Sequence, residues 1–125
     1  MSAGFLELLQ EVLTPLGHIT VRRMFGGAGL YCDGQVFALV DNDTLYFKTD
    51  EAGRTPFAAE GMGPFAYDTK NGPGALMSYW RVPERLLDEG DELCEWARRA
   101  IIVARQAQAK KKPSLAKRSV AKKMK

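Results

Sequence analysis

The last sixteen residues of the chain concentrate positive charge. They contain no acidic side chain and eight basic ones, namely Lys110, Lys111, Lys112, Lys117, Arg118, Lys122, Lys123 and Lys125. Lysine and arginine bind nucleic-acid phosphates and release the counterions condensed there, which requires charge density rather than one fixed arrangement. We therefore predict that residues 110–125 bind nucleic acid through its backbone. The segment has no aromatic side chain to stack on bases, so we expect little preference among sequences.

The rest of the chain has the opposite charge. Residues 1–109 contain ten of the 18 basic side chains and all 15 acidic ones, although the whole chain has a net charge of +3. An acidic body joined to a basic extension is typical of proteins whose extension binds polyanions. The alternative interpretation is a tail that only increases solubility.

No set of residues suited to catalysis stands out in the sequence. His18 is the single histidine and has no evident partner, and Cys32 and Cys94 lack the Cys-x-x-Cys spacing of redox and zinc sites. The glycine-rich run at residues 26–29 resembles a phosphate loop, but a strand-like segment follows it instead of the helix that such a loop requires. A bulge or sharp bend is the better interpretation. We expect a non-enzymatic protein without a metal or cofactor.

The stretch from Val21 to Thr49 predicts a meander of antiparallel strands. Residues 35–40 and 45–48 alternate with the period of two that half-buried strands show. Asp33-Gly34 readily adopts the positive φ angles of a tight hairpin turn, and the polar residues 41–43 suit the next turn. Residues 65–69 and 77–82 alternate in the same way and predict a second hairpin.

This meander resembles the TfoX/Sxy N-terminal domain family. The matching residues are Arg23-Met24-Phe25-Gly26-Gly27, Gly29, Tyr31, Asp33-Gly34, Phe37-Ala38, Leu45-Tyr46 and Lys48, followed downstream by Pro64-Phe65, Tyr67, Met77, Tyr79-Trp80, Pro83-Glu84 and Trp96. The likeness covers about residues 5–108. It implies a small α+β domain with a sheet like that of secretion chaperones, in a family linked to the regulation of competence genes. Arg23 and Lys48 match family positions and are candidates for contact with an anion or a partner, or for pairing with Asp or Glu.

Helical segments flank and interrupt the predicted strands. Residues 5–16 and 91–108 have apolar residues at the three–four spacing of amphipathic helices, and residues 50–60 predict a shorter, irregular one. The fold class we expect is α+β, a two-layer structure in which helices cover one face of an antiparallel sheet of about five strands, as in secretion chaperones.

The predicted sheet has more aromatic residues than one face can bury. Tyr31, Tyr46, Tyr79 and Trp80 cannot all lie beneath helices that cover one side. A second aromatic face usually marks a ligand surface or a subunit contact. We predict a homodimer through the face that contains Tyr46 and Tyr79; the alternative is a face screened by long polar side chains.

The chain divides into one folded unit and a tail. Residues 1–108 are expected to form a TfoX N-terminal-like domain, and residues 109–125 a disordered basic tail, because like charges repel and Pro113 interrupts a helix. No apolar run approaches the roughly 18 residues of a membrane span, and no leader sequence is evident, so we expect a cytoplasmic protein. The function we infer is a regulatory module, a transcription or competence regulator with a nucleic-acid-binding tail. The alternative is a chaperone-like adaptor that binds protein and has an incidental tail.

Overall fold

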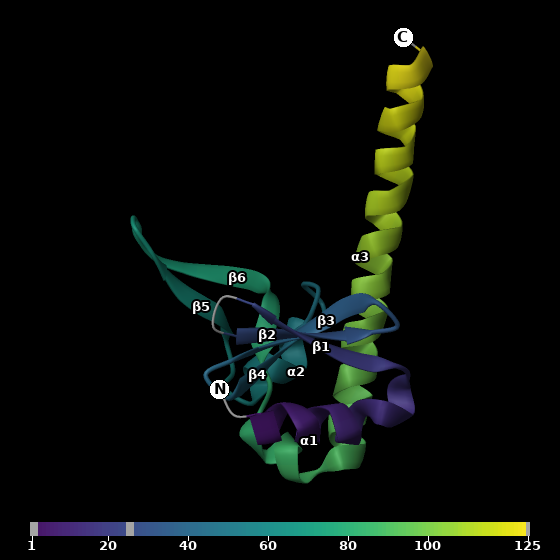
Figure 1. Ribbon diagram of the computed structural model, residues 1–125. Coiled ribbons are helices and arrows are strands. Elements are labelled where there is room, and N and C mark those ends of the chain that lie inside the picture. Colours follow the sequence, from purple (N-terminus) through teal and green to yellow (C-terminus); the bar gives the residue numbers. More distant parts are fainter. Residues whose placement is uncertain (1–2, 25–26, 125) are drawn as a thin grey trace.

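Six antiparallel strands form one sheet in the computed structural model, which describes residues 3–24 and 27–124, apart from the side chains of residues 3, 24 and 110–124 (Figure 1). The strands are β1 (Ile19–Met24), β2 (Gly27–Cys32), β3 (Gln35–Asp41), β4 (Thr44–Lys48), β5 (Pro64–Thr69) and β6 (Gly72–Arg81). Their order in the sheet is β1-β2-β3-β4-β6-β5. Strands β1 and β5 are therefore the two edges.

The two short turns of the meander form as their sequences predict. Asp33 and Gly34 have φ angles of 51° and 85°, and Asn42 and Asp43 have φ angles of 52° and 57°. Short polar side chains and glycine tolerate this left-handed region at little steric cost. These turns fix the register of β2 on β3 and of β3 on β4.

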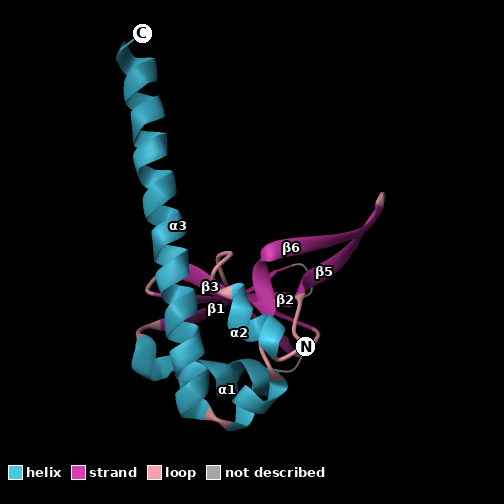
Figure 2. Cartoon of the chain, turned by 180° about the vertical axis from the view of Figure 1, so that it is seen from behind, coloured by secondary structure: helices cyan, strands magenta, loops and turns pink. Residues whose placement is uncertain are grey.

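Helices lie on one side of the sheet. They are α1 (Ala3–Leu13), α2 (Arg54–Ala59) and α3 (Gly90–Met124), with short 3-10 helices η1 (Thr14–Leu16) and η2 (Glu84–Asp88). Seen from behind, α2 and α3 lie in front of the strands (Figure 2). Helix α3 packs on β3 and β4, and α1 packs on α3 and β1. The predicted α+β class is confirmed, with six strands instead of about five.

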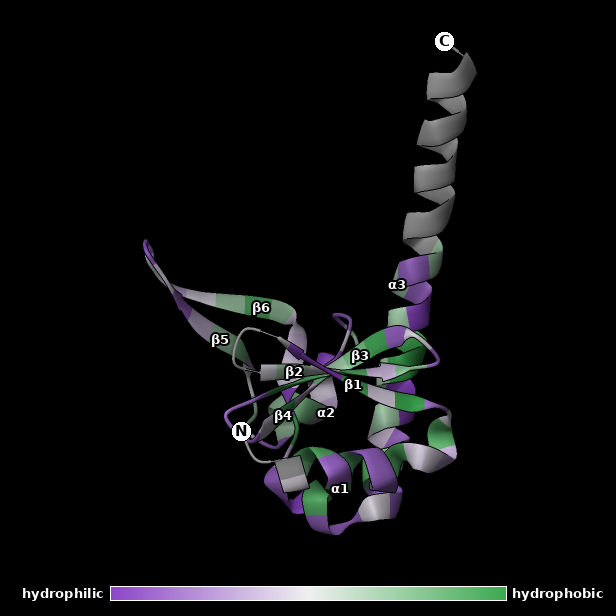
Figure 3. Ribbon diagram, in the orientation of Figure 1, coloured by the Kyte–Doolittle hydropathy of each residue, from purple (hydrophilic) through white to green (hydrophobic). Residues whose placement is uncertain are grey.

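The core lies between these helices and the sheet. Figure 3 shows hydrophobic segments of α1 and α3 where the helices meet the strands, and buried residues of both helices belong to the core. The residues of α3 that are buried there are Leu93, Ala97, Ala100, Ile101 and Ala104. On the sheet, Phe37 and Phe47 are fully buried, with ring centroids 6.2 Å apart.

A β-bulge adds a large side chain to this core. The pairing of β2 with β3 shifts between Leu30, which faces Ala38, and Tyr31, which faces Val36. Phe37 therefore has no partner across the ladder, and both Phe37 and Ala38 are completely buried. A bulge allows two successive side chains to point to one side, which strict alternation does not.

The described part of the glycine-rich run, residues 27–29, is a strand where a bulge or sharp bend was predicted. Gly27 and Gly29 belong to β2 and pair with β1 on one side, while Gly29 also pairs with Leu39 of β3. Gly26 lies outside the described residues. The segment is a strand instead of a bend because Ala28 and Leu30 are buried in the core and hold it there.

The end of the chain also differs from its prediction. Helix α3 continues to Met124 and extends away from the body beyond the sheet, where the composition predicted disorder from residue 109 (Figure 1). Lysine, arginine, alanine and glutamine are good helix formers. The docked part of α3 also supplies the helix nucleus, so that each added turn requires no new nucleation.

Arg85 of η2 joins three carboxylates. Its guanidinium lies 2.8 Å from Glu60 Oε1, 3.2 Å from Glu89 Oε1 and 2.9 Å from Glu92 Oε2. The hydrogen bonds from Arg85 hold the pKa values of Glu60 and Glu92 below the usual range. Through Glu92 in the first turn of α3 and Glu60 at the end of α2, Arg85 thus connects η2 to both helices.

This ion cluster predicts how stability depends on acid. A carboxylate whose pKa is lowered by folding contributes stability above its unfolded pKa and loses that contribution as the pH falls through its folded pKa. Wild type should therefore lose more stability than Arg85→Gln when the pH falls below about 4.5, the ordinary value for Glu60 and Glu92. Urea midpoints at neutral and acidic pH measure the difference. Arg98→Gln, which changes an exposed arginine of α3, should follow wild type; parallel curves for all three proteins would contradict the role of Arg85.

Trp96 gives a second stability prediction. It is partly buried against the core and meets the Phe57 ring edge-to-face at 4.9 Å, as expected for the residue that anchors α3. Trp96→Ala should lower the free energy of unfolding by about 3 kcal/mol, the low end for such changes, since the ring is not fully buried. Ile102→Ala, at a side chain of α3 that is 46% exposed, is the matched control and should cost less than about 1 kcal/mol. Equal urea midpoints for Trp96→Ala and wild type would show that α3 is not docked through this residue.

Candidate functional site

Seven of the eight residues predicted to bind nucleic acid belong to the distal end of α3. The backbone of residues 110–124 is helical, and this part of the helix extends beyond the sheet (Figure 1). The side chains that carry the charge, Lys110, Lys111, Lys112, Lys117, Arg118, Lys122 and Lys123, lie outside what the structure describes, as does Lys125 altogether. The backbone of this segment is therefore helical in the structure, whereas its composition predicted disorder.

Arg23 and Lys48 are not brought together. Strands β2 and β3 lie between the strands that carry them. Arg23 is paired with Ala28, which is buried beneath the helices, whereas Lys48 is paired with Tyr79 and follows Phe47, whose ring is in the core. Because side chains alternate along a strand, Arg23 and Lys48 belong to opposite faces. They therefore do not form one anion site.

Within residues 3–24 and 27–124, no helix packs on one of the two faces of the sheet. Alternation and register assign to this helix-free face the residues Thr20, Arg22, Tyr31, Leu39, Asp41, Tyr46, Lys48, Tyr79 and Arg81. Two cations are held over aromatic rings there. Arg22 Cζ lies 5.3 Å from the centroid of Tyr31, and Lys48 Nζ lies 5.1 Å from that of Tyr79. The two cation–π pairs hold basic side chains flat against the sheet.

Tyr79, one of the two residues predicted at a dimer contact, is buried within the chain itself. Only 7% of it is exposed, and burial raises the pKa of its hydroxyl to about 12, with a smaller contribution from Tyr31. The Lys48 side chain covers its ring. Sequence alternation placed Tyr79 away from the helices but could not show which neighbours would cover it. Tyr46 remains partly exposed, and a homodimer through this face stays a prediction.

Three aromatic rings continue from this face onto the second hairpin. The centroids of Tyr46 and Phe65 are 4.9 Å apart in an edge-to-face contact, and those of Phe65 and Tyr67 are 6.0 Å apart in a stacked one. We call these three residues the aromatic ladder. Burial, as the largest effect, raises the pKa of Tyr46. The alternation of Phe65 with Tyr67 was visible in the sequence, but their contact with Tyr46 was not, because β6 lies between the two strands.

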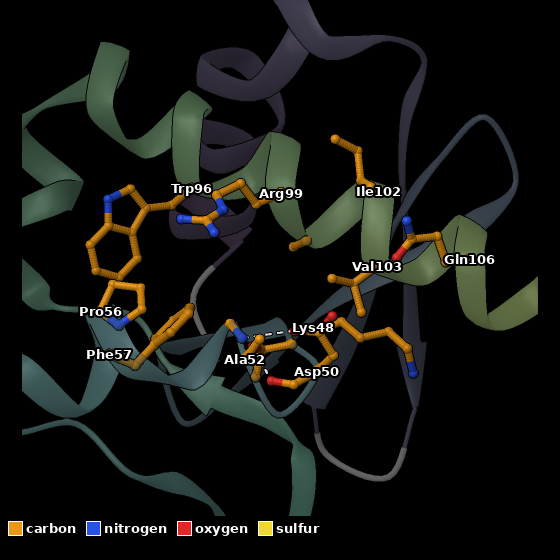
Figure 4. A pocket seen from close by; sticks show the side chains of 13 residues that line it. Lys48, Asp50, Ala52, Pro56, Phe57, Trp96, Arg99, Ile102, Val103 and Gln106 are labelled. Atoms are coloured by element: carbon orange, nitrogen blue, oxygen red, sulfur yellow. Dashed lines mark hydrogen bonds between the residues drawn. The ribbon is translucent and has the colours of Figure 1, made fainter.

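A groove of about 260 Å³ lies on the other side of the sheet, between α3 and the segment that leads from β4 into α2. Its apolar walls include Phe57, Trp96 and Val103, and Trp96 lies beside Pro56 and Phe57 (Figure 4). Asp50 at its edge accepts a hydrogen bond of 2.7 Å from the backbone amide of Gly53. An apolar surface with polar edges suits binding of a ligand or peptide rather than proton transfer.

The two cysteines are poor nucleophiles. Cys32 is buried, with Sγ 3.8 Å from Asp33 Oδ2, and burial raises the pKa of its thiol, as it does for Cys94. A thiol reacts and binds metals as the thiolate, which a raised pKa disfavours. Across residues 3–24 and 27–124, no three histidine, cysteine or acidic side chains lie together as metal ligands would. In the same ranges, no helix contains an apolar stretch of the length that crossing a bilayer requires.

The burial of Tyr79 can be tested by alkaline titration. Its hydroxyl should ionise near pH 12 rather than near 10, so tyrosinate absorbance should show a late phase that Tyr79→Phe lacks. Because the unfolded chain loses this proton first, stability should decrease as the pH rises from about 10 to about 12. Simultaneous ionisation of all four tyrosines at their ordinary pKa would contradict the burial.

Comparison with known proteins identifies the family. No curated protein matches the chain significantly. The family model described as TfoX N-terminal domain matches residues 11–104, which include every strand of the sheet and the docked part of α3. The match agrees with the resemblance carried by the Arg23–Gly27 run and the hairpin residues that follow it. The chain therefore belongs to the TfoX N-terminal domain family.

Proposed function

We propose that this protein is a non-enzymatic regulatory module that binds nucleic acid through the basic end of α3. The observation that carries the proposal is the separation of charge, eight basic and no acidic residues in the last sixteen against an excess of acidic residues in the body. Regulation of transcription, and of competence genes in particular, is the role suggested by the family.

The helical form of the tail supports this proposal. The fifteen residues 110–124, which are helical, span roughly 22 Å at about 1.5 Å per residue. Duplex DNA presents about one phosphate charge per 1.7 Å of its axis, so a basic helix of this length can lie near several phosphates at once. The acidic body is repelled by DNA, and a helix that extends beyond the body keeps the two apart (Figure 1).

The second candidate function is a protein-binding adaptor with an incidental tail. The observation that favours it is the apolar groove beside α3, at whose edge Ile102 is 46% exposed. Binding of an apolar partner would depend little on salt, whereas binding of phosphates must weaken as salt displaces the protein. Salt dependence therefore separates the two functions.

The test measures binding of the full chain to duplex DNA by fluorescence anisotropy at increasing salt concentrations. If all eight cations each neutralised one phosphate, the slope of log K against log salt would be about −7. We expect only some of them to contact phosphates at once, which predicts a slope of about −3 to −6. Replacing the eight basic residues 110–125 by glutamine, which preserves helix propensity, should abolish binding. Arg98→Gln with Arg99→Gln, two exposed cations nearer the body on the same helix, is the matched control and should leave the slope unchanged.

Equal affinity of the glutamine variant and wild type for DNA would refute the tail as the binding element. The same conclusion would follow if the slope were near zero in wild type. Circular dichroism should show that the glutamine variant keeps its fold, because Ala104 is the last residue of α3 in the described core and all substituted positions follow it.

A further inference from the structure

We propose that the helix-free face binds single-stranded nucleic acid by stacking bases on the aromatic ladder of Tyr46, Phe65 and Tyr67. This inference rests on the proposed function for the class of ligand. It adds contact with bases, which the tail cannot supply because it contains no aromatic residue. Aromatic rings on an open sheet are a recurrent platform for single strands, since every base has a face to stack.

The ladder is a continuous and accessible surface. Tyr46 and Phe65 are partly exposed, and Tyr67 is 43% exposed at the outer end. From Tyr46 the rings follow one another at 4.9 and 6.0 Å along the β5–β6 hairpin, which projects from the body (Figure 1). Neighbouring bases can therefore follow successive rings without entering the core.

The outer ring is held in place by a glycine. Tyr67 faces Gly74 across the β5–β6 ladder, and a Cβ atom at Gly74 would lie only 3.0 Å from two atoms of the Tyr67 ring. The absence of a side chain lets this ring lie directly against the β6 backbone. The ring thus packs on the backbone, and its outer surface is exposed to solvent, where a base can stack.

The charge of the face decides between a nucleic acid and a second copy of the chain. Among the strand residues that the structure describes, Arg22, Lys48 and Arg81 belong to it, against one acidic residue, Asp41, although the body as a whole is acidic. A two-fold contact would place this basic patch against itself, and like charges oppose such an interface. The negatively charged phosphates of a single strand whose bases stack on the rings would instead complement the positive charge of this patch.

The geometry also distinguishes single strands from duplexes. Bases within a duplex are stacked on one another and cannot lie on protein rings without being unstacked, whereas the bases of a single strand are free to do so. Removing a ring should therefore weaken binding of single strands and leave duplex binding, which uses the tail, unchanged.

The experiment measures the affinity of the full chain for a labelled oligothymidylate of about ten nucleotides, within the usual site size, and for a duplex of the same length. Tyr67→Ala should weaken single-strand binding about 5- to 150-fold, the range for one stacked base, and should not affect duplex binding. Tyr67→Phe, which keeps the ring, should retain wild-type affinity. Met77→Ala, which removes another exposed apolar side chain of the same hairpin, is the matched control and should have no effect.

The phosphate contacts have their own signature. Arg22→Gln should reduce the salt slope for the single strand by about 0.7, the value for one phosphate, whereas Tyr67→Ala should leave that slope unchanged. A structural defect would instead alter both quantities together. Since Tyr67 and Arg22 are exposed, neither change is expected to unfold the chain.

Several outcomes would overturn the inference. It is wrong if Tyr67→Ala leaves single-strand affinity unchanged, or weakens duplex and single-strand binding equally. It is also wrong if the wild-type protein sediments as a dimer, the Tyr67→Ala variant sediments as a monomer, and the two bind nucleic acid with equal affinity. A second copy of the chain would then occupy the helix-free face. The tail proposal can be tested separately with the full chain in which the eight basic tail residues are replaced by glutamine. If this variant no longer binds the duplex but still binds the single strand in a way that requires Tyr67, both proposals are supported. Ring-dependent binding without any effect of the tail substitutions would overturn the tail proposal alone.

Discussion

Burial of the apolar stripe of α3 against the sheet is the contact on which the rest of the structure depends. Leu93, Ala97, Ala100, Ile101 and Ala104 face Phe37, Phe47 and their neighbours in one core. Small residues on the helix allow it to approach β3 and β4 closely, and the large ones on the sheet fill the space. Fully burying a leucine, isoleucine or phenylalanine side chain contributes roughly 1.5–3 kcal/mol, so this layer supplies much of the stability that offsets chain entropy.

That contact also determines where charge and aromatic surface are placed. Because α3 docks through its first half, its second half, which is basic in sequence, extends beyond the body (Figure 1). Because α1, α2 and α3 all lie on one side, the other side of the sheet keeps its rings and its three cations. The β5–β6 hairpin then extends this face outward, with a hydrophilic tip (Figure 3). One asymmetric packing arrangement thus produces two surfaces of compatible chemistry.

The two surfaces proposed to bind nucleic acid suit different parts of it. A basic helix contacts phosphates without reading sequence, while stacked rings hold unpaired bases and exclude paired ones. Together they would allow the protein to hold a duplex and an adjacent single strand. The apolar groove beside α3 lies on the opposite side of the sheet, apart from both surfaces.

The sequence by itself determined the local features of this protein. Asp33-Gly34 and the polar residues 41–43 specify turns through their own backbone preferences, and the spacing of apolar residues specifies amphipathic helices and half-buried strands. The Arg23–Gly27 run together with these turns was enough to recognise the family. Only the tertiary structure decided the features that depend on distant neighbours. It inserted β6 between β4 and β5 and so placed Phe65 against Tyr46, it buried Tyr79 beneath Lys48, and it separated Arg23 from Lys48. Periodicity assigns a residue to a face, whereas strand order and bulges decide which residues share that face and what covers them, and these follow from packing of the whole chain.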